Sequence, residues 1–352
     1  MIERYFDNAA TSPVDPRVIE EMLPYFSDAF GNANSIHEPG RRASHAVDLA
    51  RSRVAHLFGL DDPNQVVFTS GATEANNWVL QRGGTVAVSP FEHASIREAA
   101  LALNARILSN DNYDLSYGDR SADLISVMGV NNETGAILHP PAIGGSALHR
   151  DLTQAVGKVN LSQFEFDLAS CSAHKLYGPK GVGALILKEP VSIEPLLYGG
   201  EHELGLRAGT LNVPGIVGMG VAAAIAADEA ENDRRTVVEL RALALHELKN
   251  LTDFQLNTPP GSSPYIVSLS FLGVEGETLV IELDRAGFSI SSGAACSSKS
   301  TEPSHVLVAL GMDPVWIRGT IRISFGKYNT GAAATSLGKE LRRVVEKLRT
   351  MH

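Results

Sequence analysis

Short apolar runs that alternate with polar or helical segments are the feature that most constrains the fold of this chain. The runs lie at 65–70, 84–89, 123–130, 166–171 and 182–187. Each has the length of a buried strand and is shorter than an ordinary helix. Because parallel strands need long crossover connections, usually helices, this alternation favours a largely parallel α/β sheet.

Two stretches have the pattern of helices that would pack on such a sheet. In residues 39–58, apolar side chains recur about one helical turn apart with charges between them, which indicates an amphipathic helix. Residues 215–249 are rich in Ala, Glu, Arg and Leu and contain no proline. They predict one or two long helices that bridge two domains.

The composition changes after the Pro-, Gly- and Ser-rich loop at 257–264. Strand-like IVSLSFL, FSISSG and TIRISFG follow, and an amphipathic helix with Leu337, Leu341, Val344 and Leu348 ends the chain. We therefore expect a large domain over 13–233 and a smaller α+β domain formed by 1–12 and 234–352.

Charge and cysteine content exclude several classes of protein. The net charge of -10 argues against a nucleic-acid backbone as the main partner, and 44% hydrophobic residues exclude a disordered chain. The charged N-terminus does not resemble a signal peptide, and no apolar run approaches the ~18 residues of a membrane span. Two cysteines without zinc-ligand spacing predict neither disulfides nor a metal site. We expect a cytoplasmic protein in a reducing compartment.

Lys175 lies in CSAHKLYGPKGVGALIL (171–187), between one predicted strand and the next. The glycines precede a strand, whereas a dinucleotide-binding fingerprint follows one, so that interpretation fails. A lysine in a loop is usually a solvated surface residue. The alternative is a partly desolvated amine whose lowered pKa lets it form a Schiff base with an aldehyde cofactor.

Three further segments allow both a functional and a structural interpretation. In SGATE (70–74), the start of a helix and the Thr73 hydroxyl could bind phosphate or form an ordinary cap. Asp151 and Gln154 could hold a ring nitrogen and a phenolic oxygen, or cap a helix. His93 could be catalytic or a partly buried structural residue.

The two cysteines and one arginine have distinct surroundings. Cys296 lies in the Gly-, Ala- and Ser-rich run 290–300, which resists packing, so its thiol is expected to be mobile and accessible. Cys171 lies in an apolar strand and is expected in the core. Arg322 lies among strand residues and needs an anionic partner, either a substrate carboxylate or a structural ion pair.

Nine separated segments together resemble one family. In chain order they are DNAATSPVDP, VVFTSGATEANN, EHASI, GVNNETG, DLTQAVGK, SAHKLYGPKGVGAL, GLRAGTLNVPG, SSGAACSS and IRISFG. They resemble the cysteine desulfurases of the class V aminotransferase group that depend on pyridoxal 5'-phosphate (PLP), of the NifS/IscS type. The SSGAACSS form is similar to the subgroup whose catalytic cysteine lies on a long flexible loop, here about 290–301.

The resemblance implies an aminotransferase-like PLP-dependent transferase of fold type I. Its large domain would hold a mostly parallel seven-stranded sheet, and the smaller α+β domain would carry the cysteine loop. The implied reaction removes sulfur from L-cysteine, leaves L-alanine, and forms a persulfide on Cys296 for iron–sulfur cluster assembly or thiolation acceptors. Selenocysteine lyase or another class V PLP enzyme is the alternative, and a non-catalytic binding protein on the same fold is a third.

Each site residue has a role implied by the resemblance. Lys175 would form the Schiff base, Asp151 would pair with the pyridinium nitrogen, Gln154 would contact the ring hydroxyl, and His93 would stack on the ring as a catalytic residue. Asn132 and Arg322 would hold the substrate carboxylate, with Asn132 also near the cofactor. The phosphate would be bound by Ala72, Thr73, Ser172 and His174, with Thr210 contributed by the second subunit of a homodimer.

Departures from the family pattern predict a compact variant. Residues 81–122 look shortened, and the segment 133–150 lacks room for the usual helix and full strand, so a trimmed sheet edge is expected there. Arg150 replaces an apolar residue and is expected to alter the charge at the ring. Glu201 and Leu204 replace a glycine and an arginine, which would change docking near the dimer interface.

Overall fold

The computed structural model describes residues 1–117, 121–141, 144–188, 193–293 and 302–350. Among these residues, strands join into one seven-stranded sheet in the order β1-β9-β8-β7-β6-β2-β3. β9 is antiparallel to both of its neighbours, and the other pairs are parallel. The predicted sheet is therefore confirmed, and all five apolar runs contain a strand. The strands are β1 (Val66–Thr69), β2 (Val86–Val88), β3 (Arg106–Ile107), β6 (Leu124–Ser126), β7 (Ala147–Asp151), β8 (Leu168–Ser172) and β9 (Gly183–Leu187).

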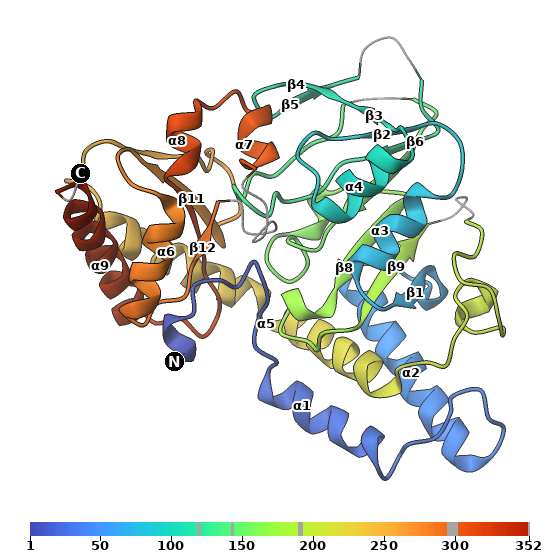
Figure 1. Cartoon of the computed structure of the whole chain (residues 1–352). Helices are drawn as coiled ribbons and strands as arrows, with labels where there is room; N and C mark the ends of the chain where they lie inside the picture. The colour runs from blue at the N-terminus through green and yellow to red at the C-terminus, as the bar shows by residue number, and fades with distance from the viewer. Residues whose placement is uncertain (118–120, 142–143, 189–192, 294–301, 351–352) are drawn as a thin grey trace.

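Helices cover both faces of this sheet (Figure 1). α2 (Glu38–Leu57) and the first half of α5 (Val213–His246) pack on one face, where they meet Ala169 and Cys171 of β8. α3 (Ala72–Leu80) and α4 (Ala94–Ala102) pack on the other, against Leu168 of the same strand. This alternation follows the two-residue period of a strand. Cys171 is a buried core residue, as its apolar surroundings predict.

A single long helix, α5, confirms the prediction of one or two long helices over residues 215–249. Figure 1 shows it running from α2 towards α9, and it contacts both helices. Within the described residues, α5 is the one helix that is long and apolar enough to cross a membrane. The expectation that no apolar segment approaches the length of a membrane span was therefore wrong. Slightly more than half of that apolar window is buried inside the fold, as in a core helix.

The C-terminal part of the described chain forms a four-stranded antiparallel sheet in the order β10-β11-β13-β12. Its apolar residues form a second core cluster, which Phe6 and Ala9 of the N-terminal segment join. The boundary at 233/234 stays a prediction. The elements are β10 (Phe254–Leu256), β11 (Ile266–Phe271), α6 (Gly276–Arg285), β12 (Ser291–Ser292), α7 (His305–Ala309), α8 (Pro314–Arg318), β13 (Thr320–Ser324) and α9 (Gly331–Arg349).

Smaller elements complete the described chain. α1 (Pro16–Met22) packs on α5, and β4 (Ser109–Asp111) pairs with β5 (Asp114–Ser116) in a hairpin. The short 3-10 turns are Ile2–Arg4, Leu23–Phe26, Pro63–Gln65, Leu161–Gln163, Ala173–Lys175 and Glu203–Gly205.

The expectation of a trimmed sheet edge at 133–150 was wrong. β7 is present and lies in the interior of the sheet, where it pairs in parallel with β6 and β8. Residues 133–141 and 144–146, the described part of this connection, contain no helix, as the sequence analysis expects. The two edge strands among the described residues are β1 and β3, and β3 has only two residues. The last residue of β7 is Asp151.

The contact between α2 and α5 gives a test of the packing. A Cβ atom on Gly220 would lie 2.5 Å from the Cα atom of Ala50, so the two backbones meet at this glycine. We predict that Gly220→Ala lowers the free energy of unfolding by about 1–2 kcal/mol, even after the ~1 kcal/mol that alanine gains over glycine in a helix. Denaturant titration measures it. Gly144→Ala, where nothing lies within 4 Å, should change stability by less than about 0.5 kcal/mol. Equal effects at the two sites would contradict this packing.

Candidate functional site

A cavity of about 650 Å³ opens at the carboxyl ends of β7 and β8, beside the loop that follows β1. Ligands of open α/β sheets bind at these carboxyl ends. The cavity brings together most of the residues predicted for the site. They are Ala72, Thr73, His93, Asn132, Asp151, Gln154, Ser172, His174, Lys175 and Arg322. Thr210 is exposed and does not line the cavity, and Cys296 lies outside the described residues.

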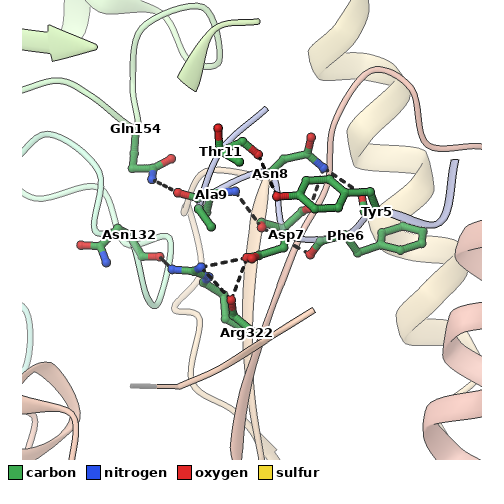
Figure 2. A network of polar contacts seen from close by, with 12 residues as sticks. Tyr5, Phe6, Asp7, Asn8, Ala9, Thr11, Asn132, Gln154 and Arg322 are labelled. Carbon is green, nitrogen blue, oxygen red and sulfur yellow. Dashed lines mark hydrogen bonds and ion pairs between the residues drawn. The ribbon is translucent and has the colours of Figure 1, made fainter. Parts of the chain in front are cut away.

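Lys175 follows β8 in the turn Ala173–Lys175 and faces the cavity, so it is not a surface lysine. Its Nζ donates to the carbonyl oxygens of Ala9 and Ala10, at 2.5 and 2.6 Å. The Nε2 atom of Gln154 donates to the same Ala9 oxygen, at 2.9 Å, as Figure 2 shows. The N-terminal segment therefore positions two predicted cofactor residues at once.

Asp151 ends β7 and is almost fully buried. Its Oδ1 accepts from the backbone N–H of Thr153 at 2.9 Å, in a turn and not at the start of a helix, so the helix-cap interpretation was wrong. Its Oδ2 accepts from Nδ2 of Asn76 on α3, at 2.8 Å. The carboxylate is thus fixed in direction at the cavity wall, and it can also accept from a protonated ring nitrogen.

His93 is both the cap of a helix and a wall of the cavity. Its Nδ1 accepts from the backbone N–H of Ser95 at the start of α4, at 3.1 Å. Burial lowers the pKa of His93; Asp151 opposes the shift, and Lys175 and Arg322 reinforce it. A neutral imidazole is an aromatic plane suited to stacking on a heteroaromatic ring.

The start of α3 and the end of β8 form an anion cradle. Ala72 and Thr73 open the helix, and the side chains of Ser172 and His174 lie opposite them along the cavity. Free N–H groups at a helix start bind phosphate well. Burial, with Lys175, Lys180 and Lys158 nearby, lowers the pKa of His174 to about 4, so it is neutral at pH 7.

Glycine at position 183 lets the start of β9 approach the residue before α3 closely. A Cβ atom there would lie 2.7 Å from the Cα atom of Gly71, which precedes α3. Glu74 in the first turn of α3 would repel an anion, but its Oε1 pairs with Nε of Arg207 at 2.9 Å. The sequence analysis did not identify Glu74 and Arg207 as a pair, because 133 positions separate them.

Arg322 has the structural ion pair that the sequence allowed as one alternative. Its Nη2 lies 2.9 Å from Oδ1 of Asp7 and 3.2 Å from Oγ of Ser291, and its Nη1 donates to the carbonyl of Asn132 at 2.9 Å (Figure 2). Its Nε is buried and has no hydrogen-bond partner among the described residues. Arg322 lines the cavity, and a guanidinium has five N–H donors, so these three contacts leave donors that a substrate carboxylate could use.

Asp7 and Ser291 are site residues that the sequence analysis missed. Oγ of Ser291 donates to Oδ1 of Asp7 at 2.8 Å, so both side chains hold Arg322 and line the cavity. The one signal in the sequence is that Asp7 is the acidic residue at the head of DNAAT.

Arg150 points away from the cavity. It alternates with Asp151 along β7, and its Nη2 donates to the carbonyl of Leu138 at 2.6 Å while the guanidinium lies over the ring of Phe164. Burial lowers the pKa of Arg150 to about 10, opposed by Glu92. Arg150 is not among the residues that line the cavity, so it has no direct contact with a ring bound there.

Glu201 and Leu204 both lie at the surface, but Glu203 between them is buried. Oε1 of Glu203 pairs with Nη2 of Arg51 on α2 at 2.7 Å, and Oε2 accepts from the backbone of Phe68 at 2.6 Å. This buried pair anchors the segment on α2 and β1. The anchor was not predicted.

The donor set fits pyridoxal phosphate. One cavity presents an amine, a fixed carboxylate, a neutral imidazole, an amide and an anion cradle. Arg322 lines the same cavity, and its guanidinium is the kind of group that binds a substrate carboxylate.

Comparisons with known proteins give a consistent result. The family model "Aminotransferase class-V" matches residues 4–337. The chain is 38% identical to "Cysteine desulfurase IscS" of Methanosarcina thermophila over 99% of this chain and 93% of that protein. It is also 38% identical to "Cysteine desulfurase IscS 1" of Archaeoglobus fulgidus, over 99% and 98%.

Two solved structures extend the comparison. A "NIFS-LIKE PROTEIN" superposes with a TM-score of 0.89 at 34% identity, covering 98% of this chain and all of that one. "SspA in complex with cysteine" gives a TM-score of 0.78 at 30% identity, covering 93% of this chain and all of that one.

His149, behind Asp151, gives a test of the site's polar surroundings. It is fully buried, with Nδ1 2.8 Å from Oγ of Ser126 and Nε2 3.2 Å from Oγ of Ser170. Burial lowers its pKa to about 4; Asp151 opposes the shift and Arg150 adds to it. Because the unfolded chain binds this proton more tightly, stability is lost as pH falls from about 6.5 to 4.

We predict that wild type loses roughly 3 kcal/mol more than His149→Gln between pH 7 and pH 4, since glutamine does not titrate there. Denaturant titrations at several pH values measure both curves. Curves of equal slope for the two proteins would contradict a neutral, buried His149.

Proposed function

The chain belongs to the aminotransferase class-V family, among its cysteine desulfurases of the NifS/IscS type, and from this premise we propose that it works with PLP in the described cavity. It is an enzyme whose family removes sulfur from L-cysteine. The observation that carries the proposal is that Lys175, Asp151 and His93, far apart in sequence, line one cavity.

The reaction balances without an added oxidant or reductant. L-cysteine and the thiol of Cys296 give L-alanine and a persulfide on Cys296. The carbon–sulfur bond of the substrate breaks, a sulfur–sulfur bond forms at Sγ of Cys296, and a C–H bond replaces the lost one. The persulfide is then transferred to an acceptor of iron–sulfur cluster assembly or of a thiolation pathway.

The residues divide the work as follows. Bound PLP would supply an electron sink for the carbon that loses its proton. Nζ of Lys175 would hold the cofactor aldehyde and, once released, move the proton at the substrate α-carbon. Asp151 would keep the ring nitrogen protonated, and His93 would cover the ring. Thr73, Ser172, His174 and the backbone at Ala72 would hold the phosphate.

Cys296 is within reach of this cavity by chain length alone. Ser291 lines the cavity, and Cys296 follows it by five residues. Five residues span at most about 17 Å, which bounds the distance between the two α-carbons. A sulfur carrier needs such proximity at one moment and access to an acceptor at another.

A homodimer completes the proposal. Thr210 is exposed, so it would serve the cavity of a second subunit rather than its own. Large apolar side chains that a partner could cover are more than half exposed in the segments 23–36 and 197–204, namely Leu23, Phe26, Phe30, Ile36, Tyr198 and Leu204. We place the enzyme in the reducing cytoplasm, where a carrier thiol stays unpaired.

Mass spectrometry tests the sulfur carrier. After incubation with L-cysteine, the peptide that contains Cys296 should gain the mass of one sulfur. Lys175→Ala and Cys296→Ala should each abolish alanine release with an acceptor present, and Cys171→Ser should leave the gain in place. A gain confined to Cys171 would refute the assignment. Full turnover by Cys296→Ala, or turnover with L-selenocysteine alone, would favour a selenocysteine lyase.

Arg322 gives a test of substrate recognition. Arg322→Lys keeps the charge but cannot hold Asp7, the Asn132 carbonyl and a substrate carboxylate together. We predict that KM for L-cysteine rises at least about tenfold, with a smaller fall in kcat. The exposed Arg318→Lys is the matched control and should change neither constant. An unchanged KM in Arg322→Lys would remove Arg322 from the substrate site.

A further inference from the structure

Lys158 is a buried lysine directly behind the cofactor cavity. It is 6% exposed, and its Nζ donates to Oε1 of Gln154 at 2.8 Å. Among the described residues, no carboxylate lies within 4 Å of this ammonium. Burial lowers the pKa of Lys158 to about 7, and the charges of Lys175 and Arg322 add to the shift. Because a buried cation without a carboxylate destabilises a fold, its presence calls for a functional reason.

The contact determines which way the amide of Gln154 points. In its protonated form the amine of Lys158 has three donors and no acceptor, so in that form only the Oε1 side of the amide can face it, which is the orientation in the structure. The Nε2 side must therefore face the opposite direction, towards the N-terminal segment and the cavity. A flipped amide would place donors against donors.

The Nε2 group has two N–H bonds. One is used by the carbonyl of Ala9, at 2.9 Å (Figure 2), and the other is available to an acceptor in the cavity that Gln154 lines. The same Ala9 carbonyl accepts from Nζ of Lys175 at 2.5 Å. A chain of hydrogen bonds thus leads from Lys158 through Gln154 and Ala9 to Lys175.

We propose that Lys158 is a positioning residue that orients the Gln154 amide so that it donates to the ring oxygen of the cofactor. The inference rests on the proposed function, because it needs PLP in the cavity. It assigns Lys158 no contact with the cofactor itself, since Lys158 is not among the residues that line the cavity.

A double-mutant cycle on cofactor affinity tests the inference. Apoprotein is titrated with PLP, and the absorbance that the cofactor gains on bonding to lysine is followed. We expect Lys158→Met and Gln154→Ala each to weaken binding by roughly tenfold, the order of one hydrogen bond to a charged group. The double variant should bind within about twofold of Gln154→Ala, because Lys158 acts only through Gln154.

Two controls accompany the cycle. Lys188→Met removes a lysine that lies over the ring of Phe166, outside the cavity, and should not change PLP affinity. Lys158→Arg keeps N–H donors and should recover most of the affinity. Thermal unfolding of the apoproteins should show Lys158→Met at least as stable as wild type, since it replaces a buried charge with an apolar chain.

The outcomes separate the inference from the proposed function. Wild type that binds no PLP would refute the proposed function. If wild type binds PLP, then unchanged affinity in Lys158→Met, a multiplicative loss of about a hundredfold in the double variant, or a destabilised Lys158→Met apoprotein would each overturn the positioning role.

Discussion

The docking of the N-terminal segment against both sheets is the constraint on which the site depends. Backbone and side chain of Asn8 bond to the carbonyl of Ser324 on β13, and Ser12 bonds to the carbonyl of His174 beside Lys175. Between these anchors, Asp7 holds Arg322 and the Ala9 carbonyl holds Lys175 and Gln154. One short segment thus sets the distance between Arg322 on one side of the cavity and Lys175 on the other.

Several cationic side chains line the cavity, which suits the anionic groups that we propose it binds. Lys175, Lys180 and Arg322 line it, with Lys158 close behind, whereas burial keeps His93 and His174 neutral. A phosphate and a substrate carboxylate would bring negative charge to this set of cations. Asp7 and Glu74 repel a bound anion less than free carboxylates would, because each forms an ion pair with an arginine. Asp151 is the acid left to face a ring nitrogen, where a negative charge has chemical use.

The spacing of apolar residues predicted most of the fold, because short apolar runs indicate buried strands and apolar residues one helical turn apart indicate the buried face of a helix. β7 was missed since its sequence, ALHRD, has a histidine and two charges, yet its last three residues are buried. Their burial is stabilised by contacts that no local pattern reveals, such as His149 between two serines and Arg150 on the Leu138 carbonyl. The same contacts explain why Arg150 turned out to face away from the site.

The sequence by itself determined the chemistry of this protein, because a lysine, an acid, a histidine and a cysteine in the order of a known family limit the reactions open to the chain. Only the tertiary structure decided how the site is held together. It brought Asp7 to Arg322, buried Lys158 behind Gln154, and used the carbonyl of Ala9 as a shared acceptor. The physical reason is that these contacts depend on strand register, on side-chain direction and on backbone atoms that every residue carries. The identity of a residue specifies none of these three.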